Sequence, residues 1–151
     1  MKKSLRLPLL LCALILATAL SAVWHLSTRP ETESGAILLR RGDQESVIRP
    51  DMLSFSIVHL ETVNAKGETR SIDGPGILLC DALTAAGIDT DSIESVTVTA
   101  SDSYSASVTG EELRAKRVWL TLQADDTWQL VLPEDADSRR NVRSVQLLEV
   151  A

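Results

Sequence analysis

The sequence has few of the residues that build metal sites and catalytic triads. Its 151 residues include two cysteines and two histidines. Cys12 lies in an apolar N-terminal run and Cys80 lies far outside it, so the two cannot pair, and we expect no disulfide framework. So few Cys and His residues cannot make a closed zinc site, and no spaced Asp/Asn loop of the calcium-binding type occurs. His59 stands alone in an expected strand, so we expect no Ser-His-acid triad, no catalytic residue and no metal site.

The sequence also lacks an excess of positive charge. It carries 15 Lys and Arg residues against 21 Asp and Glu residues, a formal net charge of −6. Removing the three N-terminal charges Lys2, Lys3 and Arg6 takes this value to −9 for the rest of the chain. An acidic surface repels phosphate backbones, so we do not expect nucleic acid as a partner. A glycine-rich phosphate loop is missing as well, since "DGPGI" has no Lys-Ser/Thr after it.

The N-terminus carries a membrane-targeting segment. After the basic residues, the apolar run "LPLLLCALILATALSAV" extends from Leu7 to Val23. Two interpretations stay open: a cleaved signal peptide, or an uncleaved anchor of about the ~18 residues that a span needs. Small residues near Ala19 suit signal peptidase, whereas Trp24 and His25 suit a membrane interface. We favour the anchor slightly, because no cleavage site stands out.

This segment divides the chain into three parts. Residues 1–26 are the signal peptide or membrane anchor, and residues 27–34 are a polar tether around Pro30. Residues 35–151 are the folded domain. Basic residues stay on the cytoplasmic side, so the domain is expected outside the cytoplasmic membrane, held there by the anchor or secreted after cleavage.

The folded part is expected to be rich in strands. A hairpin is predicted over 36–48, with Arg41-Gly42-Asp43 as its polar tip rather than an adhesion motif. A helical turn is predicted at 50–53, and a helix over 77–87 with Gly87 as its stop. Further strands are predicted over 53–63, 68–72, 92–100, 118–122, 128–132 and 142–150, with a turn or short helix at 109–113 and a backbone break at 73–76. The fold class is therefore α+β, with a mostly antiparallel or mixed sheet and one main helix.

Four segments, taken in order, carry a family resemblance: "GPGILLCDALTAAGI", "ESVTVTASDSYSASVTGEEL", "WQLVLPED" and "SRRNVRSVQLLEV". Together they resemble the molybdopterin-binding oxidoreductase domain of the sulfite oxidase family, from about Gly74 to Val150 and weakly back to Ile37. The resemblance implies that residues 35–151 adopt part of that fold. It places Asp102-Ser103-Tyr104 where the family has an Asp-Gly-Tyr turn, with the aspartate capping backbone amides and the tyrosine lying against the sheet.

The chain also departs from this family. The family binds molybdenum through a cysteine in an earlier half of a longer domain, and this sequence lacks that half. Cys80 does not match the ligand, because it lies in the helix that follows, beside Asp81, which raises a thiol pKa. Arg143-Ser144 stands in the place of a usual Lys-Trp pair. We therefore expect no cofactor. The alternative is a molybdopterin-binding oxidoreductase subunit that a partner chain completes.

The candidate contact residues for a ligand or partner form a small set: Arg139, Arg140, Arg143, Asp102 and Tyr104. The three guanidinium groups can hold a phosphate or carboxylate, or they can pair with the adjacent Glu134, Asp135 and Asp137, which we favour. The function expected is a non-catalytic extracytoplasmic binding or interaction domain. Its partner would be another envelope protein or a small anionic ligand.

Overall fold

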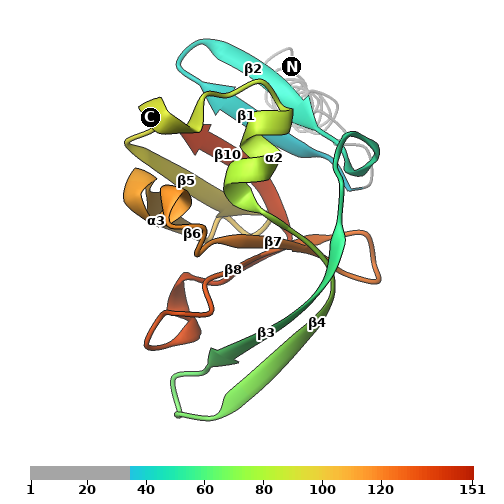
Figure 1. The fold of residues 1–151 in the computed structure, drawn as a ribbon, viewed down its shortest axis with the longest axis vertical. Coiled ribbons are helices and arrows are strands. Elements are labelled where there is room, and N and C mark those ends of the chain that lie inside the picture. The colour runs from blue at the N-terminus through green and yellow to red at the C-terminus, as the bar shows by residue number, and fades with distance from the viewer. Residues whose placement is uncertain (1–34) are drawn as a thin grey trace, which may run out of the picture. The chain divides into compact units, whose positions relative to one another are not determined.

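The computed structural model describes residues 35–151, whose strands form two five-stranded sheets (Figure 1). Sheet A has the order β2-β1-β10-β5-β6, with β1 (Ile37–Arg41), β2 (Gln44–Ile48), β5 (Ser95–Ala100), β6 (Ser105–Thr109) and β10 (Val145–Val150). Sheet B has the order β3-β4-β7-β8-β9, with β3 (Ser56–Val63), β4 (Thr69–Leu78), β7 (Trp119–Leu122), β8 (Trp128–Val131) and β9 (Val142–Arg143). The main helix is α2 (Leu79–Ala85), and α3 (Gly110–Arg114), η1 (Pro50–Met52), η2 (Thr90–Ser92) and η3 (Ser138–Arg140) are shorter. The predicted α+β class is confirmed.

The predicted membrane segment and tether, residues 1–34, lie outside the described residues. Within residues 35–151, no helix has both the length and the apolarity needed to cross a bilayer.

Sheet A is antiparallel except for β1 and β10, which run parallel. The predicted hairpin of β1 and β2 turns at Gly42, which has φ 57°, a left-handed value that glycine adopts without steric cost. Strand β6 was not predicted, because its residues Ser105 and Ser107 favour a loop. Its other residues, Ala106 and Val108, are buried, so the strand does carry the alternation of a half-buried sheet.

Sheet B is antiparallel throughout. In β3 the predicted alternation is confirmed: Val58, Leu60 and Thr62 are buried, while Ile57 is 70% exposed. The predicted hairpin of β7 and β8 also forms, and its turn places Asp126 at φ 59°. In Figure 1 the β3–β4 hairpin projects beyond the other strands of the sheet.

The predicted backbone break at 73–76 is wrong, since β4 runs through it to Leu78. Gly76 lies against β3, where an added Cβ would stand 2.6 Å from a methyl carbon of Val58, so glycine allows this close approach. Pro75 opposes Ile57 of β3 and has no counterpart on β7, whose pairing begins at Gly76. Glycine and proline therefore serve strand packing here, and helix α2 begins two residues later than predicted.

The predicted last strand, 142–150, is two strands in different sheets. Val142 pairs with Leu130 in sheet B, and Val145 pairs with Ala100 in sheet A. Between them Ser144 has φ 50°, the left-handed turn that redirects the chain from one sheet to the other. A serine gives no sequence signal for such a turn, whereas a glycine would have done so.

The main core joins both sheets and helix α2. It includes Leu79 and Leu83 of the helix, Leu148 of sheet A and Leu120 and Leu130 of sheet B, each at most 1% exposed. Burial of each such side chain contributes about 1.5–3 kcal/mol. A second, smaller cluster contains Val58, Leu60 and Val131, with Ile72 and Trp119 packed against it. The main core therefore covers one face of β7 and β8, and the smaller cluster covers part of the other face of sheet B.

Candidate functional site

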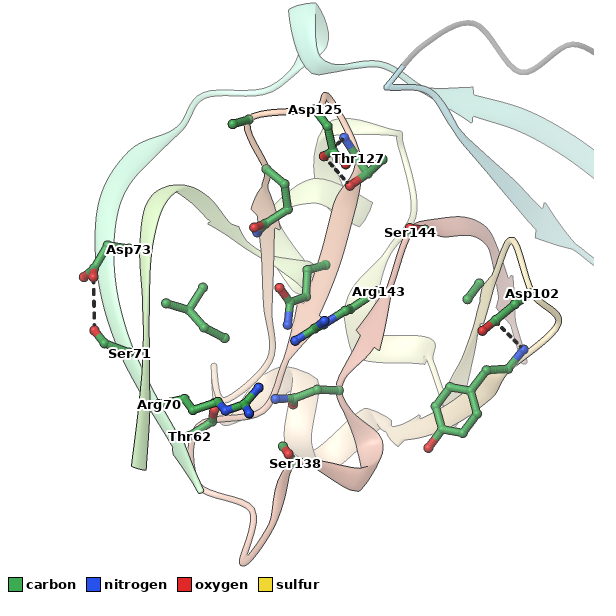
Figure 2. Close-up of a pocket in the computed structure, with 17 residues that line it drawn as sticks. Thr62, Arg70, Ser71, Asp73, Asp102, Asp125, Thr127, Ser138, Arg143 and Ser144 are labelled. Carbon is green, nitrogen blue, oxygen red and sulfur yellow. Dashed lines mark hydrogen bonds between the residues drawn. The ribbon is translucent and has the colours of Figure 1, made fainter. Parts of the chain in front are cut away.

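A cavity of about 930 Å³, here called the groove, lies on the second face of sheet B (Figure 2). Its orientation follows from strand pairing, since Thr121 of β7 opposes Gln129 of β8, which opposes Arg143 of β9. Directly opposed residues project on the same face of a sheet. Leu130, the next residue after Gln129, points the other way into the main core. The groove therefore occupies the face that the small apolar cluster leaves open.

Two arginines enter the groove from different strands. Arg70 belongs to β4, and Arg143 belongs to β9. Figure 2 shows their guanidinium groups reaching toward the middle of the groove from opposite sides. Within residues 35–151, neither side chain makes a hydrogen bond or an ion pair. Ten guanidinium N–H donors are thus available to an anion, five from each arginine.

Two buried polar side chains that line the groove also lack partners. Thr62 is 5% exposed and Gln129 is 9% exposed. Neither side chain makes a hydrogen bond within the described part of the chain. Asn141 is half engaged, because its Oδ1 accepts the Leu132 N–H at 3.0 Å and leaves its amide nitrogen free to donate. No fully buried side-chain nitrogen or oxygen of residues 35–151 lacks a partner, so the unbonded polar atoms of Thr62 and Gln129 are accessible from the groove, where water or a ligand can bond them.

Three aspartates belong to the segments that line the groove, each held by a local hydrogen bond, and Asp73 projects with His59 from the face of the β3–β4 hairpin opposite Arg70. Asp73 accepts from Ser71 at 3.1 Å and lies 2.5 Å from His59 Nδ1, and the hydrogen bond from His59 is the main cause of its lowered pKa. Asp125 accepts from Thr127, whose hydroxyl at 2.7 Å and N–H at 3.2 Å lower the pKa of the carboxyl. The third carboxylate, Asp102, is described with its turn below. Both carboxyls are therefore bonded in their ionised form, and their pKa values lie below the ordinary value for aspartate.

The candidate residues Asp102 and Tyr104 form one edge of the groove. Asp102 accepts the N–H of Tyr104 at 3.0 Å, which is the expected capping role. Ser103 between them has φ 70°, the left-handed value that the glycine of an Asp-Gly-Tyr turn would supply without strain. Tyr104 is 47% exposed, and its hydroxyl donates to the carbonyl of Arg139. The tyrosine therefore connects the β5–β6 turn to the η3 segment.

Arg140 is fully engaged in ion pairs. It contacts both oxygens of Asp135, at 2.6 and 2.8 Å, and both oxygens of Glu112, at 2.7 and 3.2 Å. These bonds raise the pKa of Arg140 further and, with the Thr109 capping box, lower the pKa of Glu112 to about 2. Arg140 therefore holds the η3 segment on α3 and has no capacity left for a ligand.

The other charged residues near η3 also form ion pairs. Arg139 pairs with Asp137 at 3.0 Å, and Glu134 pairs with Arg117 at 3.1 Å. The expected pairing of arginines with the neighbouring acids thus forms at Arg139 and Arg140. It does not form at Arg143, which is the one member of the predicted cluster that lines the groove without a partner.

Arg70, Thr62 and Gln129 were not singled out from the sequence. Arg70 lies 73 positions before Arg143, and only the strand order β4-β7-β8-β9 places both on one face of sheet B. A signal does exist in the pattern, since Gln129 interrupts an apolar run and Thr62 and Arg70 sit at inward-facing strand positions. Polar residues at such strand positions indicate a binding site only weakly until the strand order is known.

The described residues do not fit a resident molybdenum centre. No group of three Cys, His, Asp or Glu side chains in residues 35–151 is arranged to hold a metal. Cys80 is 8% exposed, and burial, followed by the charge of Asp81, raises its thiol pKa. A metal-ligating cysteine needs the opposite environment, one that favours the thiolate.

Comparison with protein-family models gave no match for the chain, and a search of the curated proteins gave none either. The groove is the feature on which a function can be argued.

Proposed function

We propose that residues 35–151 form a non-catalytic binding domain for a small anionic ligand, with the groove as the binding site. The observation that carries this proposal is the pair Arg70 and Arg143, two unpaired guanidinium groups that face the same space in an acidic protein. Guanidinium groups bind carboxylates and phosphates through two parallel hydrogen bonds. An anion between them also removes the repulsion of two like charges.

The groove chemistry supports binding rather than catalysis. Its polar lining comprises amides, hydroxyls, guanidinium groups and aspartates, and no lining hydroxyl of the described residues is hydrogen-bonded to a histidine or lysine that could activate it. His59, a possible base, has a side chain that is 77% exposed and is engaged by Asp73. The extracytoplasmic location of this domain rests on the N-terminal sequence alone, and so does contact with the membrane. A further envelope protein as partner stays a prediction.

A second candidate is a molybdopterin-binding oxidoreductase subunit completed by a partner chain. It is favoured by the position of Arg143, which belongs to the segment resembling the sulfite oxidase family and lines the groove. The two-sheet α+β arrangement and the turn at Asp102–Tyr104 would then be parts of a truncated domain of that family. In this version the partner would supply the metal ligands. Stoichiometric molybdenum and pterin in the purified full chain would replace our first proposal with this one.

The binding proposal is tested with simple anions on the full chain in a mild non-ionic detergent. Titration with acetate and with inorganic phosphate, followed by amide and guanidinium NMR shifts, should give saturable changes around the groove. Arg70→Ala and Arg143→Ala should each weaken binding by about tenfold or more, the loss expected for one charge-assisted hydrogen-bonding partner.

Arg139→Ala is the matched control, because Arg139 lies four positions away and pairs with Asp137. It should leave the affinity unchanged. Equal affinities of wild type and Arg143→Ala would show that the groove is not the anion site, and the proposal would be abandoned.

A further inference from the structure

The charges of the groove have two zones. Figure 2 shows Arg70 and Arg143 in the middle, with Asp125 and Asp102 toward the outside, whereas the side chain of Asp73 points away from the groove. The two edge carboxylates, Asp125 and Asp102, come from the β7–β8 turn and the β5–β6 turn. A molecule that fills this space meets positive charge at the centre and negative charge at the edge. A polyanion would be repelled by the edge, whereas a ligand with one charge of each sign satisfies both zones.

Polar side chains lie between the charged groups of the groove, and a ligand has to supply their hydrogen-bonding partners. The side-chain amide of Gln129, which makes no hydrogen bond within residues 35–151, offers both a donor and an acceptor. Thr62 adds a hydroxyl that is accessible from the groove, and Asn141 adds an amide N–H. A ligand with a planar group that both donates and accepts would satisfy these positions, and a peptide bond is such a group.

We propose that the ligand is a short peptide with free termini. Its C-terminal carboxylate lies between Arg70 and Arg143, a peptide group bonds the amide of Gln129, and its N-terminal ammonium faces the carboxylates of the edge. This proposal rests on the proposed function, since it names the class of the anionic ligand. The groove has one aromatic side chain, Tyr104, so it favours small or polar peptide side chains over large apolar ones.

Three matched probes test the proposal on the full chain by calorimetry: triglycine, N-acetyl-triglycine and triglycine amide. Triglycine should bind most tightly. Its amide should bind about tenfold more weakly or worse, because the carboxylate that the arginines hold is gone. The acetylated peptide should bind about threefold more weakly, because the exposed edge carboxylates lose their ammonium partner.

Variants of the groove residues test which side chain binds each part of the peptide. Asp125→Asn keeps an acceptor for Thr127 and removes the charge, so it should weaken triglycine and leave N-acetyl-triglycine unchanged. Glu134→Gln is the control, because Glu134 pairs with Arg117 and does not line the groove. Gln129→Leu should weaken all three peptides and leave acetate binding intact.

The outcomes separate this inference from the function on which it depends. If acetate and phosphate bind but triglycine does not, or if N-acetyl-triglycine binds as tightly as triglycine, the peptide class is overturned and the anion site stands. If none of the probes binds, both proposals fail. Binding of triglycine that Arg143→Ala does not affect would also overturn both.

Discussion

The two faces of sheet B show how one set of strands serves two purposes. On one face, Leu120 and Leu130 are fully buried in the main core. On the other, their neighbours Thr121 and Gln129 turn toward the groove beside the small apolar cluster. At β7 and β8 the first face packs against the main core, whereas the second keeps the side-chain amide of Gln129 without a protein partner. The comparison indicates that the groove face leaves hydrogen-bonding groups accessible to water or a ligand, because no fully buried side-chain nitrogen or oxygen of the described residues lacks a partner.

The largest expected effect comes from the core face. Leu130→Ala should lower the free energy of unfolding by about 3 kcal/mol, because it leaves a cavity at a site with no exposure. The adjacent change Gln129→Leu should be neutral or stabilising, because it removes an amide that has no partner. Urea denaturation of the two variants measures the difference. A loss of similar size in both would show that the two faces do not differ as we describe.

The second effect distinguishes two arginines three positions apart. Arg140→Ala should destabilise by about 2 kcal/mol, because Glu112 and Asp135 lose their partner in a partly buried site. Arg143→Ala should change stability by less than about 0.5 kcal/mol, as for surface residues away from structural contacts. Thermal denaturation of both variants provides the test. Strong destabilisation by Arg143→Ala would mark it as structural.

The third effect concerns acid. The folded chain holds the pKa of Glu112 at about 2, against an ordinary 4.5, so ionised Glu112 stabilises the fold above pH 4.5. This contribution is lost as the pH falls from about 4.5 through 2, and it amounts to about 2 kcal/mol after allowance for partial exposure. Unfolding free energies at pH 7 and pH 3 should therefore differ less in Glu112→Gln than in the wild type. Equal differences would contradict the ion pair with Arg140.

The smallest effect concerns the turn at the edge of the groove. Ser103→Gly should stabilise the fold by about 0.5 kcal/mol, because glycine removes the strain of φ 70° but loses some of this gain to unfolded-chain entropy. Ser107→Gly in strand β6 is the control and should destabilise, since glycine weakens a strand. Thermal melting measures both. A destabilising Ser103→Gly would mean that serine itself stabilises this turn.

Local patterns account for most of the elements. The alternation of β3, the hairpin turn at Gly42 and the stop at Gly87 each depend on a few neighbouring residues, and these predictions are confirmed. The errors lie where distant segments decide. Strand β4 continues through Pro75 because β3 lies beside it, and the chain changes sheets at Ser144 because its two halves have different partners.

The sequence by itself determined the strand-rich α+β character, the acidic balance and the scarcity of metal and triad residues, because composition and short-range periodicity specify these. Only the tertiary structure decided which arginine is free. Arg140 is neutralised by Glu112 from 28 positions away, and Arg143 lines the same groove as Arg70 from 73 positions away. Charge partners depend on distances in space, and distances in space follow strand order, which no local pattern contains.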